Sequence, residues 1–343
     1  MSGRAPFRDG PLDRAGLPFA FPVAETPDAL RGAVVAIGNF DGVHRGHQHV
    51  LRIAEAAARA AGRPAIALTF EPHPRTVFRP DAPVFRITPP AAKAAVMAAF
   101  GLDGMAVAAF DRAFASLSAE AFVERILAGD LGASHLVVGD DFRYGARRAG
   151  DAATLEAAGR AHGFSVEVVA KIGEADGEAI SSTRIRAALA DGDLGTAARL
   201  LGYRPIVIAP VIHGEKRGRQ MNYPTANQAL GPDCRLRHGI YAVRVLVDGR
   251  WRGGAASYGR RPTFDDGAPL LETFVFDFSG DLYGRELQVA LVAWIRPELK
   301  FDGIEALVRR MDEDCRVARD ILASTTPISP LDERLNFADP DGP

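Results

Sequence analysis

The stretch GNFDGVHRGH, residues 38–47, directly follows the short apolar run AVVAI at residues 33–37. It contains His44 and His47, and His49 follows two residues later, so three of the eight histidines are crowded together. The apolar run is typical of a strand that is buried on both faces. In a parallel sheet, the loop after such a strand lies at the carboxyl edge, where α/β proteins bind their ligands. The stretch therefore predicts a parallel α/β fold for the first half of the chain and a ligand site within it.

Strand-like and helix-like segments alternate from this stretch to about residue 190. The helix signals include first-turn prolines in TPPAAKAAVMAAFG and Ser118 as the cap of LSAEAFVERILAG. Such alternation predicts right-handed βαβ units and a Rossmann-like parallel sheet. Strands are expected at 33–37, 64–70, 104–110, 133–139 and 164–170, and helices over HQHVLRIAEAAARAAG, TPPAAKAAVMAAFG, LSAEAFVERILAG and DAATLEAAGRAHG.

Beyond residue 190 the pattern changes to segments rich in Val, Ile and aromatic residues, among them RPIVIAPVI, LLETFVFDF and ELQVALVAWI. Asp248 and Gly249 separate two such runs, which is a strong hairpin signal. One long helix is expected near the end, over FDGIEALVRRMDEDCRVARDIL. The second half is therefore predicted to be an antiparallel β-barrel closed by a helix. We predict domains at 31–190 and 203–323, a flexible arm at 1–30 and a disordered tail at 324–343.

The composition of the 343 residues argues against several classes of protein. With 41 basic and 43 acidic residues the net charge is −2, whereas a general nucleic-acid binder would be more basic. Cys234 and Cys315 lack ligand-like spacing, which argues against a disulfide framework or a structural zinc site. The N-terminus lacks the apolar core of a signal peptide, and no apolar run approaches the ~20 residues of a membrane span. We expect a soluble cytoplasmic protein, monomeric or weakly oligomeric, without nucleic-acid or membrane partners.

The residue types in the stretch suit a phosphate-bearing ligand. Gly38, Gly42 and Gly46 let the backbone approach a ligand closely. A helix that begins near Gly46 would aim free N–H groups at the ligand, and two imidazoles could donate hydrogen bonds to phosphate oxygens. From these residues alone three other interpretations stay open: a turn with incidental histidines, a helix cap, and a metal pair of His44 and His47, which lacks obvious further ligands.

Together with three further motifs, the stretch resembles bacterial bifunctional riboflavin kinase/FMN adenylyltransferases, also called FAD synthetases. HRGH, residues 44–47, is similar to the H-x-G-H signature of nucleotidyltransferases that adenylylate phosphate-bearing acceptors. TFEPHPR (69–75), VVGDDFRYGARRAGD (137–151) and ISSTRIR (180–186) follow in the family's order. The resemblance covers roughly residues 30–322. It implies that riboflavin and ATP give FMN, and that FMN and ATP then give FAD and pyrophosphate.

In the first half the resemblance implies a site for ATP and FMN. His44 and His47 would contact the ATP phosphates with help from Asn39, and a Mg²⁺ ion on the triphosphate is expected. Ser182, Thr183 and Arg186 would lie on the other side of the triphosphate, although SSTRIRAAL alone is an ordinary helix cap. Phe70, Phe142 and Tyr144 could touch flavin or equally belong to the core. The other nucleotide or flavin contacts are expected at Gly38, Phe40, Gly46, Pro72, His73 and Asp141.

In the second half PTAN, residues 224–227, resembles the nucleotide-binding signature of riboflavin kinases. The resemblance implies that Thr225 and Asn227, beside Pro224, bind Mg²⁺-nucleotide. Glu272 lies where the family has its catalytic glutamate, which would take the proton from the ribityl 5′-hydroxyl as it attacks the γ-phosphate of a second ATP. The alternative is a solvent-facing acid on an alternating strand. A cationic loop before PTAN contains Gly214, Lys216 and Gly218. This loop would either cover the phosphates of the nucleotide or be merely solvated.

Two positions depart from the kinase pattern and keep other functions open. Asn222 replaces a usual glycine, and Ser257 stands where asparagine is frequent. A chain with only the adenylyltransferase active, and a kinase half that merely binds flavin, is therefore an alternative. A non-enzymatic flavin or nucleotide sensor would be favoured by the loss of His44 or Glu272, and both are present. A third alternative is a nucleotidyltransferase that acts on another phosphate acceptor. This alternative would give the second domain no function.

Overall fold

The computed structural model describes residues 19–173, 177–213, 223–260 and 269–339. The chain divides into two compact units: residues 1–84 with 93–181, and residues 85–92 with 182–343. Each unit contains a sheet and a hydrophobic core of its own.

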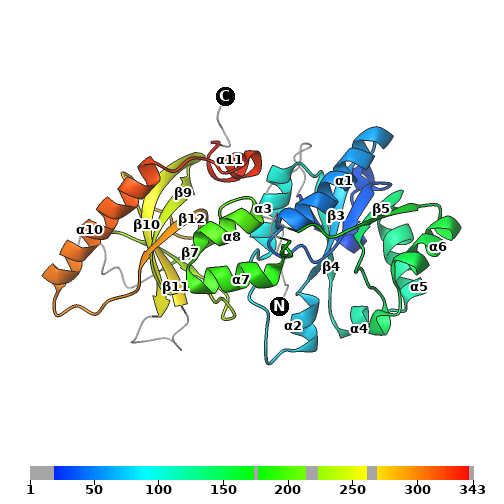
Figure 1. Ribbon diagram of the computed structural model, residues 1–343, viewed down its shortest axis with the longest axis horizontal. Coiled ribbons are helices and arrows are strands. Elements are labelled where there is room, and N and C mark those ends of the chain that lie inside the picture. Colours follow the sequence, from blue (N-terminus) through cyan, green and yellow to red (C-terminus); the bar gives the residue numbers. More distant parts are fainter. Residues whose placement is uncertain (1–18, 174–176, 214–222, 261–268, 340–343) are drawn as a thin grey trace. The chain divides into compact units, whose positions relative to one another are not determined.

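A six-stranded parallel sheet forms the centre of the first unit (Figure 1). Its spatial order is β1-β4-β3-β2-β5-β6, so the order reverses between β2 and β5. Every residue of β2 is buried, as expected for a strand with both faces covered. The parallel α/β fold predicted from the sequence is confirmed. The strands are β1 (Ala20–Pro22), β2 (Val34–Ile37), β3 (Ala65–Glu71), β4 (Gly104–Ala109), β5 (His135–Gly139) and β6 (Ser165–Val169).

Helices alternate with these strands along the chain. The expected helix over LSAEAFVERILAG consists of a short α-helix and a π-helix, and the Ser118 hydroxyl caps it by accepting a hydrogen bond from the N–H of Ala121 at 3.1 Å. The helices are α1 (Arg45–Ala61), α2 (Pro74–Phe78), α3 (Pro90–Phe100), α4 (Arg112–Ala115), α5 (Ala119–Ala121), the π-helix η3 (Phe122–Asp130), the 3-10 turn η4 (Ala146–Arg148) and α6 (Ala152–His162).

The prediction of a flexible arm over residues 1–30 is wrong for residues 19–30. Strand β1 pairs in parallel with β4, and the 3-10 turns η1 (Val23–Glu25) and η2 (Asp28–Leu30) follow it. Phe21 and Leu30 are buried against Gly104, where a Cβ atom would lie 3.0 and 2.9 Å from them. The prolines indicated a loose arm, but β1 is an edge strand, where proline is tolerated. Residues 1–18 of the arm lie outside the described residues.

A closed six-stranded barrel with antiparallel pairing forms the second unit, in the order β10-β11-β8-β7-β12-β9. Asp248 and Gly249 both have positive φ, 51° and 70°, as a tight hairpin turn requires. Helix α10 (Ile304–Ala323) packs against β9, β10 and β12 (Figure 1), so the predicted barrel with a closing helix is confirmed. The other elements are α7 (Ser182–Asp191), α8 (Leu194–Leu201), β7 (Ile206–Ile212), β8 (Ala226–Ala229), β9 (Gly239–Val247), β10 (Arg250–Arg260), β11 (Pro269–Val275) and β12 (Glu286–Arg296).

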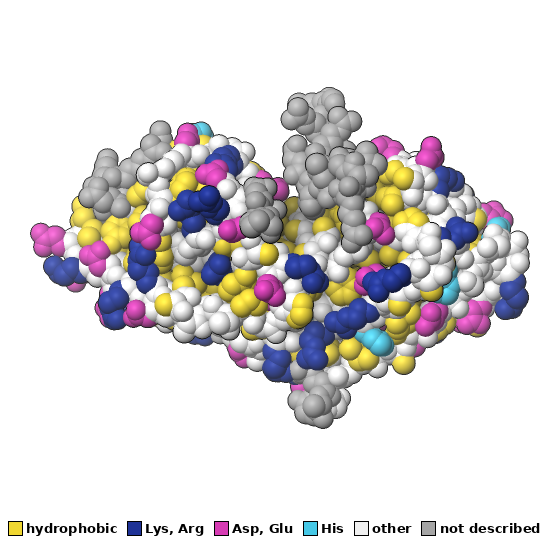
Figure 2. Space-filling model, turned by 90° about the horizontal axis from the view of Figure 1, so that it is seen from above, with side chains coloured by type: hydrophobic (Ala, Val, Ile, Leu, Met, Phe, Trp, Pro, Cys, Tyr) yellow, Lys and Arg dark blue, Asp and Glu magenta, His cyan; other side chains and the backbone are white. Residues whose placement is uncertain are grey.

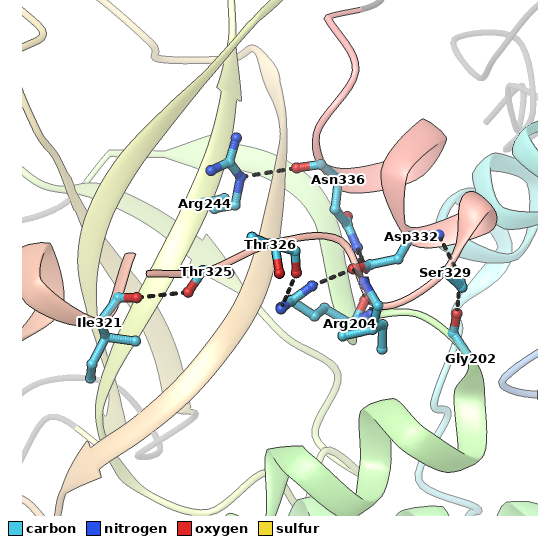
Figure 3. A network of polar contacts seen from close by, with 10 residues as sticks. Gly202, Arg204, Arg244, Ile321, Thr325, Thr326, Ser329, Asp332 and Asn336 are labelled. Carbon is cyan, nitrogen blue, oxygen red and sulfur yellow. Dashed lines mark hydrogen bonds and ion pairs between the residues drawn. The ribbon is translucent and has the colours of Figure 1, made fainter. Parts of the chain in front are cut away.

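The predicted disordered tail is also wrong for residues 324–339, because helix α11 (Pro330–Asn336) is anchored to the second unit (Figure 3). Asp332 and Asn336 are completely buried. The Asp332 carboxylate accepts hydrogen bonds from the backbone N–H of Arg204, at 2.8 Å, and from the Arg204 guanidinium. The Arg244 guanidinium donates to the Asn336 carbonyl at 3.0 Å. Local composition suggested disorder because Arg204, the ion-pair partner of Asp332, lies 128 residues away along the chain.

The variant Asp332→Ala is expected to lower the free energy of unfolding of the second unit by about 3–5 kcal/mol, because the buried Arg204 would lose its partner. Both tryptophans, Trp251 and Trp294, lie on barrel strands, so urea unfolding followed by tryptophan fluorescence reports on this unit. Glu333→Ala, at an exposed position of the same helix, is the matched control. Equal unfolding midpoints for Asp332→Ala and the wild type would contradict a stabilising role for α11.

Candidate active sites

The stretch 38–47 leaves the carboxyl end of β2 and enters α1, as the sequence predicts. The loop at residues 140–145 leaves β5, which is paired with β2 on the other side of the point where the strand order reverses. Loops at such a point border the place where open α/β sheets bind ligands. The two motifs that the sequence singled out, HRGH and DDFRYG, are thus brought to one edge of the sheet.

The two histidines of the loop stack on one another at the start of α1, with ring centroids 3.6 Å apart and planes at 14°. Nδ1 of His44 accepts a hydrogen bond from the backbone N–H of His47 at 3.3 Å, so His44 caps the helix. A ring nitrogen that accepts carries no hydrogen, so the neutral His44 ring holds its hydrogen on Nε2. The helix-cap interpretation is therefore correct for His44, and it makes Nε2 the donor atom of this ring.

His47 lies between His44 and the ring of Phe40, which meets it edge-on with centroids 5.4 Å apart. Burial, followed by the electrostatic influence of His44 and of the Lys93 ammonium, holds the pKa of His47 well below its usual range. Its Nδ1 atom is buried without a hydrogen-bond partner in the described part of the chain. At neutral pH the His47 ring is therefore neutral, and toward an anionic ligand it can act as a hydrogen-bond donor but not as a positive charge.

The loop backbone is strained where it passes the histidines. Phe40 and Val43 have φ of 47° and 37°, a region that costs non-glycine residues about 1–3 kcal/mol each. Gly42, between them, has φ of 87°, which glycine adopts without this cost. A Cβ atom at Gly46 would lie 3.2 Å from the His44 ring, and one at Gly38 would lie 3.1 Å from the Phe40 ring. The surrounding structure must therefore hold this loop in place.

Sequence reasoning missed Lys93, which lies next to this loop. Its side chain is buried on α3, and its ammonium donates hydrogen bonds to the Asn39 carbonyl, the Thr69 hydroxyl and the Glu71 carboxylate at 2.9, 3.0 and 2.9 Å. Asn39, predicted to assist ATP binding, thus contributes its backbone carbonyl to a buried polar cluster. A single lysine in the otherwise apolar helix AAKAAVMAAF was the signal available in the sequence.

Four phenylalanines form a cluster at the carboxyl ends of β3 and β4, with the centroids of neighbouring rings 5.5 to 6.0 Å apart. Phe78 is 65% exposed, so the cluster reaches the surface. Phe70 was predicted as a flavin contact from the motif TFEPHPR. The other members, Phe78, Phe110 and Phe114, were missed because single aromatic residues after a strand carry no sequence signal. The cluster consists of Phe70, Phe78, Phe110 and Phe114.

The remaining flavin-side candidates have structural partners of their own. Tyr144 is buried in the core of the first unit, and the half-buried Phe142 stacks on it with ring centroids 5.6 Å apart. Asp141 is exposed and paired with Lys171 at 2.8 Å. His73, which follows Pro72, caps α2 through Nδ1, which accepts a hydrogen bond from the N–H of Arg75 at 3.1 Å. The core interpretation of Tyr144 is therefore correct, and flavin contact by the others stays a prediction.

The motif ISSTRIR lies at the start of α7. Ser182 is the first residue of this helix and Thr183 the second, and Nε of Arg186 donates a hydrogen bond to the Phe85 carbonyl at 2.7 Å. Helix α7 groups with the second compact unit. Contact of these residues with the triphosphate at His44 and His47 stays a prediction.

A row of polar residues crosses three neighbouring barrel strands in the second unit. Glu272 on β11 is directly opposite Asn227 on β8 and directly opposite Ser257 on β10. Residues opposite one another on paired strands point to the same face. Glu272 is half-buried and Asn227 is 4% exposed, so the row is no ordinary solvent-facing strand surface. Two residues predicted for the kinase reaction, 45 positions apart in the chain, are brought side by side.

The surroundings of this row are acidic and aromatic. Burial and the charge of Glu272 raise the pKa of Glu298, and His238 partly offsets them. The Tyr223 ring, beside PTAN, lies 4.9 Å from the Phe274 ring, and its hydroxyl donates to Asp312 on α10. Thr225 is half-buried and Pro224 exposed just before β8. The predicted contacts at Gly214, Lys216 and Gly218 lie outside the described residues.

Comparison with known proteins assigns a family to each half. The family model of FAD synthetase matches residues 26–184, and that of riboflavin kinase matches residues 201–322. The bifunctional riboflavin kinase/FMN adenylyltransferase of Pseudomonas fluorescens is 44% identical over 85% of this chain and 94% of that protein. This chain belongs to that family.

Other members of the bifunctional riboflavin kinase/FMN adenylyltransferase family agree over nearly their whole length. The Escherichia coli K12 enzyme is 39% identical over 86% of this chain and 95% of that protein, and the Listeria monocytogenes enzyme is 41% identical over 82% and 90%. A crystal structure named as a macrolide-efflux protein from Streptococcus pneumoniae is 32% identical, with a TM-score of 0.73, over 88% of this chain and 99% of that chain. The resemblance read from the motifs is thus confirmed.

Two positions, Ser257 and Asn222, depart from the usual sequence pattern of riboflavin kinases. Ser257 is in the polar row beside Glu272, so a hydroxyl stands there in place of the frequent asparagine amide. Asn222 lies outside the described residues. In the described part of the chain no cluster of three or more His, Cys, Asp or Glu side chains is placed to hold a metal ion. Among the same residues no helix is both long and apolar enough to cross a membrane.

Proposed function

We propose that the loop at residues 38–47 carries the adenylylation of FMN, and that the row Asn227–Glu272–Ser257 carries the phosphorylation of riboflavin. The chain is a bifunctional riboflavin kinase and FMN adenylyltransferase, with the FAD synthetase domain first and the kinase domain second. The observation that carries the first assignment is the stack of His44 and His47 at the N-terminus of α1. Imidazoles at the N-terminus of a helix, where the helix dipole favours negative charge, suit a triphosphate.

In the adenylyltransferase, a phosphate oxygen of FMN attacks the α-phosphorus of ATP. The bond from the α-phosphorus to the bridging oxygen breaks, and pyrophosphate leaves. The attacking phosphate is already ionised at neutral pH, so the reaction needs positioning and charge stabilisation more than a base. The Nε2–H of His44 and the His47 ring would hydrogen-bond phosphate oxygens as negative charge develops on them.

The leaving pyrophosphate needs a second set of donors. Ser182 and Thr183 at the start of α7 can bind phosphate oxygens through hydroxyl and N–H groups, and the guanidinium of Arg186 can neutralise the leaving charge. We therefore propose these three residues as contacts of the pyrophosphate, and the loop residues Gly38, Asn39, Phe40 and Gly46 as further contacts of ATP.

The phenylalanine cluster is proposed to receive the isoalloxazine ring of FMN, since exposed aromatic rings stack on flat ring systems. Phe78→Ala is expected to raise the KM for FMN about fivefold, given ~1–3 kcal/mol for such stacking, with riboflavin phosphorylation unchanged. Initial rates of FAD formation at varied FMN would measure this. Val168→Ala, at another exposed apolar residue of the first unit, is the control. An unchanged KM for FMN would remove Phe78 from the flavin site.

In the kinase, the ribityl 5′-hydroxyl of riboflavin attacks the γ-phosphorus of ATP, and ADP leaves. Glu272 is proposed to accept the hydroxyl proton as the new bond forms. The half-buried position of this carboxylate, with Asn227 opposite and the acidic Glu298 nearby, favours such a role over that of a surface charge. Phosphoryl transfer relies on alignment and charge neutralisation, which the rigid barrel strands supply.

A Mg²⁺ ion is proposed at Thr225 and Asn227, and the donor set fits it. Thr225 is two positions before Asn227, the spacing that places side chains on one side of an extended chain. A hydroxyl and an amide oxygen are the hard ligands that Mg²⁺ takes, together with substrate phosphates. When bound, the ion would neutralise charge on the transferring phosphate.

We further propose a cytoplasmic location, and a monomer or weak oligomer that binds small substrates only. On the face seen in Figure 2, basic and acidic side chains are interspersed. With a net charge of −2, the anionic substrates would be bound by local geometry and not by a large basic surface.

The leaving groups provide a test of the two assignments. Supplied with FMN, the protein should release one pyrophosphate for each FAD and no ADP. Supplied with riboflavin, it should release one ADP for each FMN before any pyrophosphate is formed. ADP release that accompanies FAD formation from FMN would contradict the proposed adenylylation.

A further inference from the structure

The ammonium of Lys93 is buried directly against the ATP loop of the first unit. Lys93 is 0% exposed, and its three hydrogen-bond acceptors are the Asn39 carbonyl, the Thr69 hydroxyl and the Glu71 carboxylate. The Thr69 hydroxyl also donates to the Asn39 carbonyl at 3.1 Å. An ammonium has three N–H donors, and each of these three acceptors can take one of them.

Packing alone gives no reason for a charge at this position. The neighbouring buried residues of α3 include Ala92, Ala94, Val96 and Met97. Burying an ammonium is costly unless it is paired and hydrogen-bonded, and the pairing with Glu71 at 2.9 Å offsets that cost. The ion pair with Glu71 does not account for the hydrogen bond from Lys93 to the Asn39 carbonyl, which belongs to the loop and not to β3.

The backbone of the loop at residues 38–47 is strained and must be held in place by contacts with the rest of the unit. Phe40, the next residue, has φ of 47°, and Val43 has φ of 37°, so the chain between Asn39 and His44 is held in a disfavoured conformation. Strain of this kind persists only where the surrounding structure fixes it. Lys93 and Thr69 fix the loop at its start, and the His44 cap fixes it at its end.

We propose that Lys93 is a positioning residue of the adenylyltransferase: its ammonium anchors the Asn39 carbonyl and thereby holds the loop that presents His44 and His47 to ATP. The proposal rests on the proposed function of that loop. Its charge also acts on His47, because Lys93 and His44 are the groups whose fields, with burial, lower the pKa of His47. Lys93 thus helps to keep the His47 ring neutral.

The double variant Lys93→Met/Glu71→Gln tests this without leaving a buried charge unpaired. We expect kcat/KM for FAD formation from FMN to fall about 100-fold, since small displacements of catalytic groups cost that much. Riboflavin phosphorylation, measured in the same sample, should stay within twofold of wild type. The control is Arg59→Met/Glu55→Gln, which removes an exposed pair from α1 in the same unit.

A second readout needs no turnover. In NMR titrations without substrate, the midpoint of His47 should move to higher pH in Lys93→Met/Glu71→Gln and stay in place in the control. A lysine whose ammonium lay away from the histidine stack would leave this midpoint unchanged. FAD formation within threefold of wild type, or an unmoved His47 midpoint in the folded variant, would overturn the proposal.

If the double variant does not fold, the single variant Lys93→Arg tests the positioning role of Lys93 instead. It keeps the charge, but a planar guanidinium cannot meet the same three acceptors, so about a tenfold loss of FAD formation is expected with kinase activity intact. Wild-type kcat/KM in Lys93→Arg would overturn the positioning role. A wild-type protein that makes no FAD from supplied FMN would instead overturn the proposed function of the loop.

Discussion

The variant His47→Ala is expected to lose FAD formation about 100- to 1,000-fold, the usual cost of removing one donor that stabilises developing charge. His47 is stacked on His44, and burial, to which the positive charge of Lys93 adds, keeps its ring neutral. It is therefore suited to donate a hydrogen bond to the triphosphate. FMN formation from riboflavin should be unchanged, because Glu272 and Asn227 belong to the other unit.

The experiment measures FMN and FAD separately by chromatography, from riboflavin and from supplied FMN. His49→Ala is the matched control, since His49 is on the same helix and outside the stack. Equal loss of both activities in His47→Ala would contradict two separate sites. Wild-type FAD formation in His47→Ala would remove this ring from the reaction.

The variant Glu272→Gln is expected to reduce riboflavin phosphorylation about 100- to 10,000-fold, the contribution typical of a positioned general base. Glutamine keeps the size of the side chain and its place between Asn227 and Ser257, but it cannot take the hydroxyl proton. Adenylylation of supplied FMN should continue at the wild-type rate.

Glu286→Gln, at an exposed position on β12, serves as the control for a lost carboxylate on the barrel. Unfolding followed by the two barrel tryptophans would show that Glu272→Gln leaves the fold intact. If the folded Glu272→Gln protein phosphorylates riboflavin at the wild-type rate, Glu272 is not the base. It would then be a solvent-facing acid on an alternating strand.

The parts of the fold that follow local rules could be predicted from the sequence. The run AVVAI predicted β2 to within one residue, because a strand buried on both faces is continuously apolar. Asp248-Gly249 predicted the β9–β10 hairpin, because its turn needs two residues with positive φ. The polar loop after β2 predicted the first site, because its position at the edge of a parallel sheet follows from the topology.

The parts that depend on distant partners could not be predicted. β1 and α11 looked disordered because their prolines are local signals, whereas burial against Gly104 and pairing with Arg204 are tertiary. Lys93 was overlooked because its acceptors come from another strand and loop. The alignment of Asn227 with Glu272 depends on strand register, which motifs identify only through resemblance.

We propose that one chain makes FMN at one site and FAD at another. The most direct test is a time course of the purified protein with riboflavin, ATP and Mg²⁺, with the flavins separated by chromatography. FMN should rise first, and FAD should follow as FMN accumulates. FAD from supplied FMN but no product from riboflavin would contradict it, and would leave only the loop of His44 and His47 as a working site.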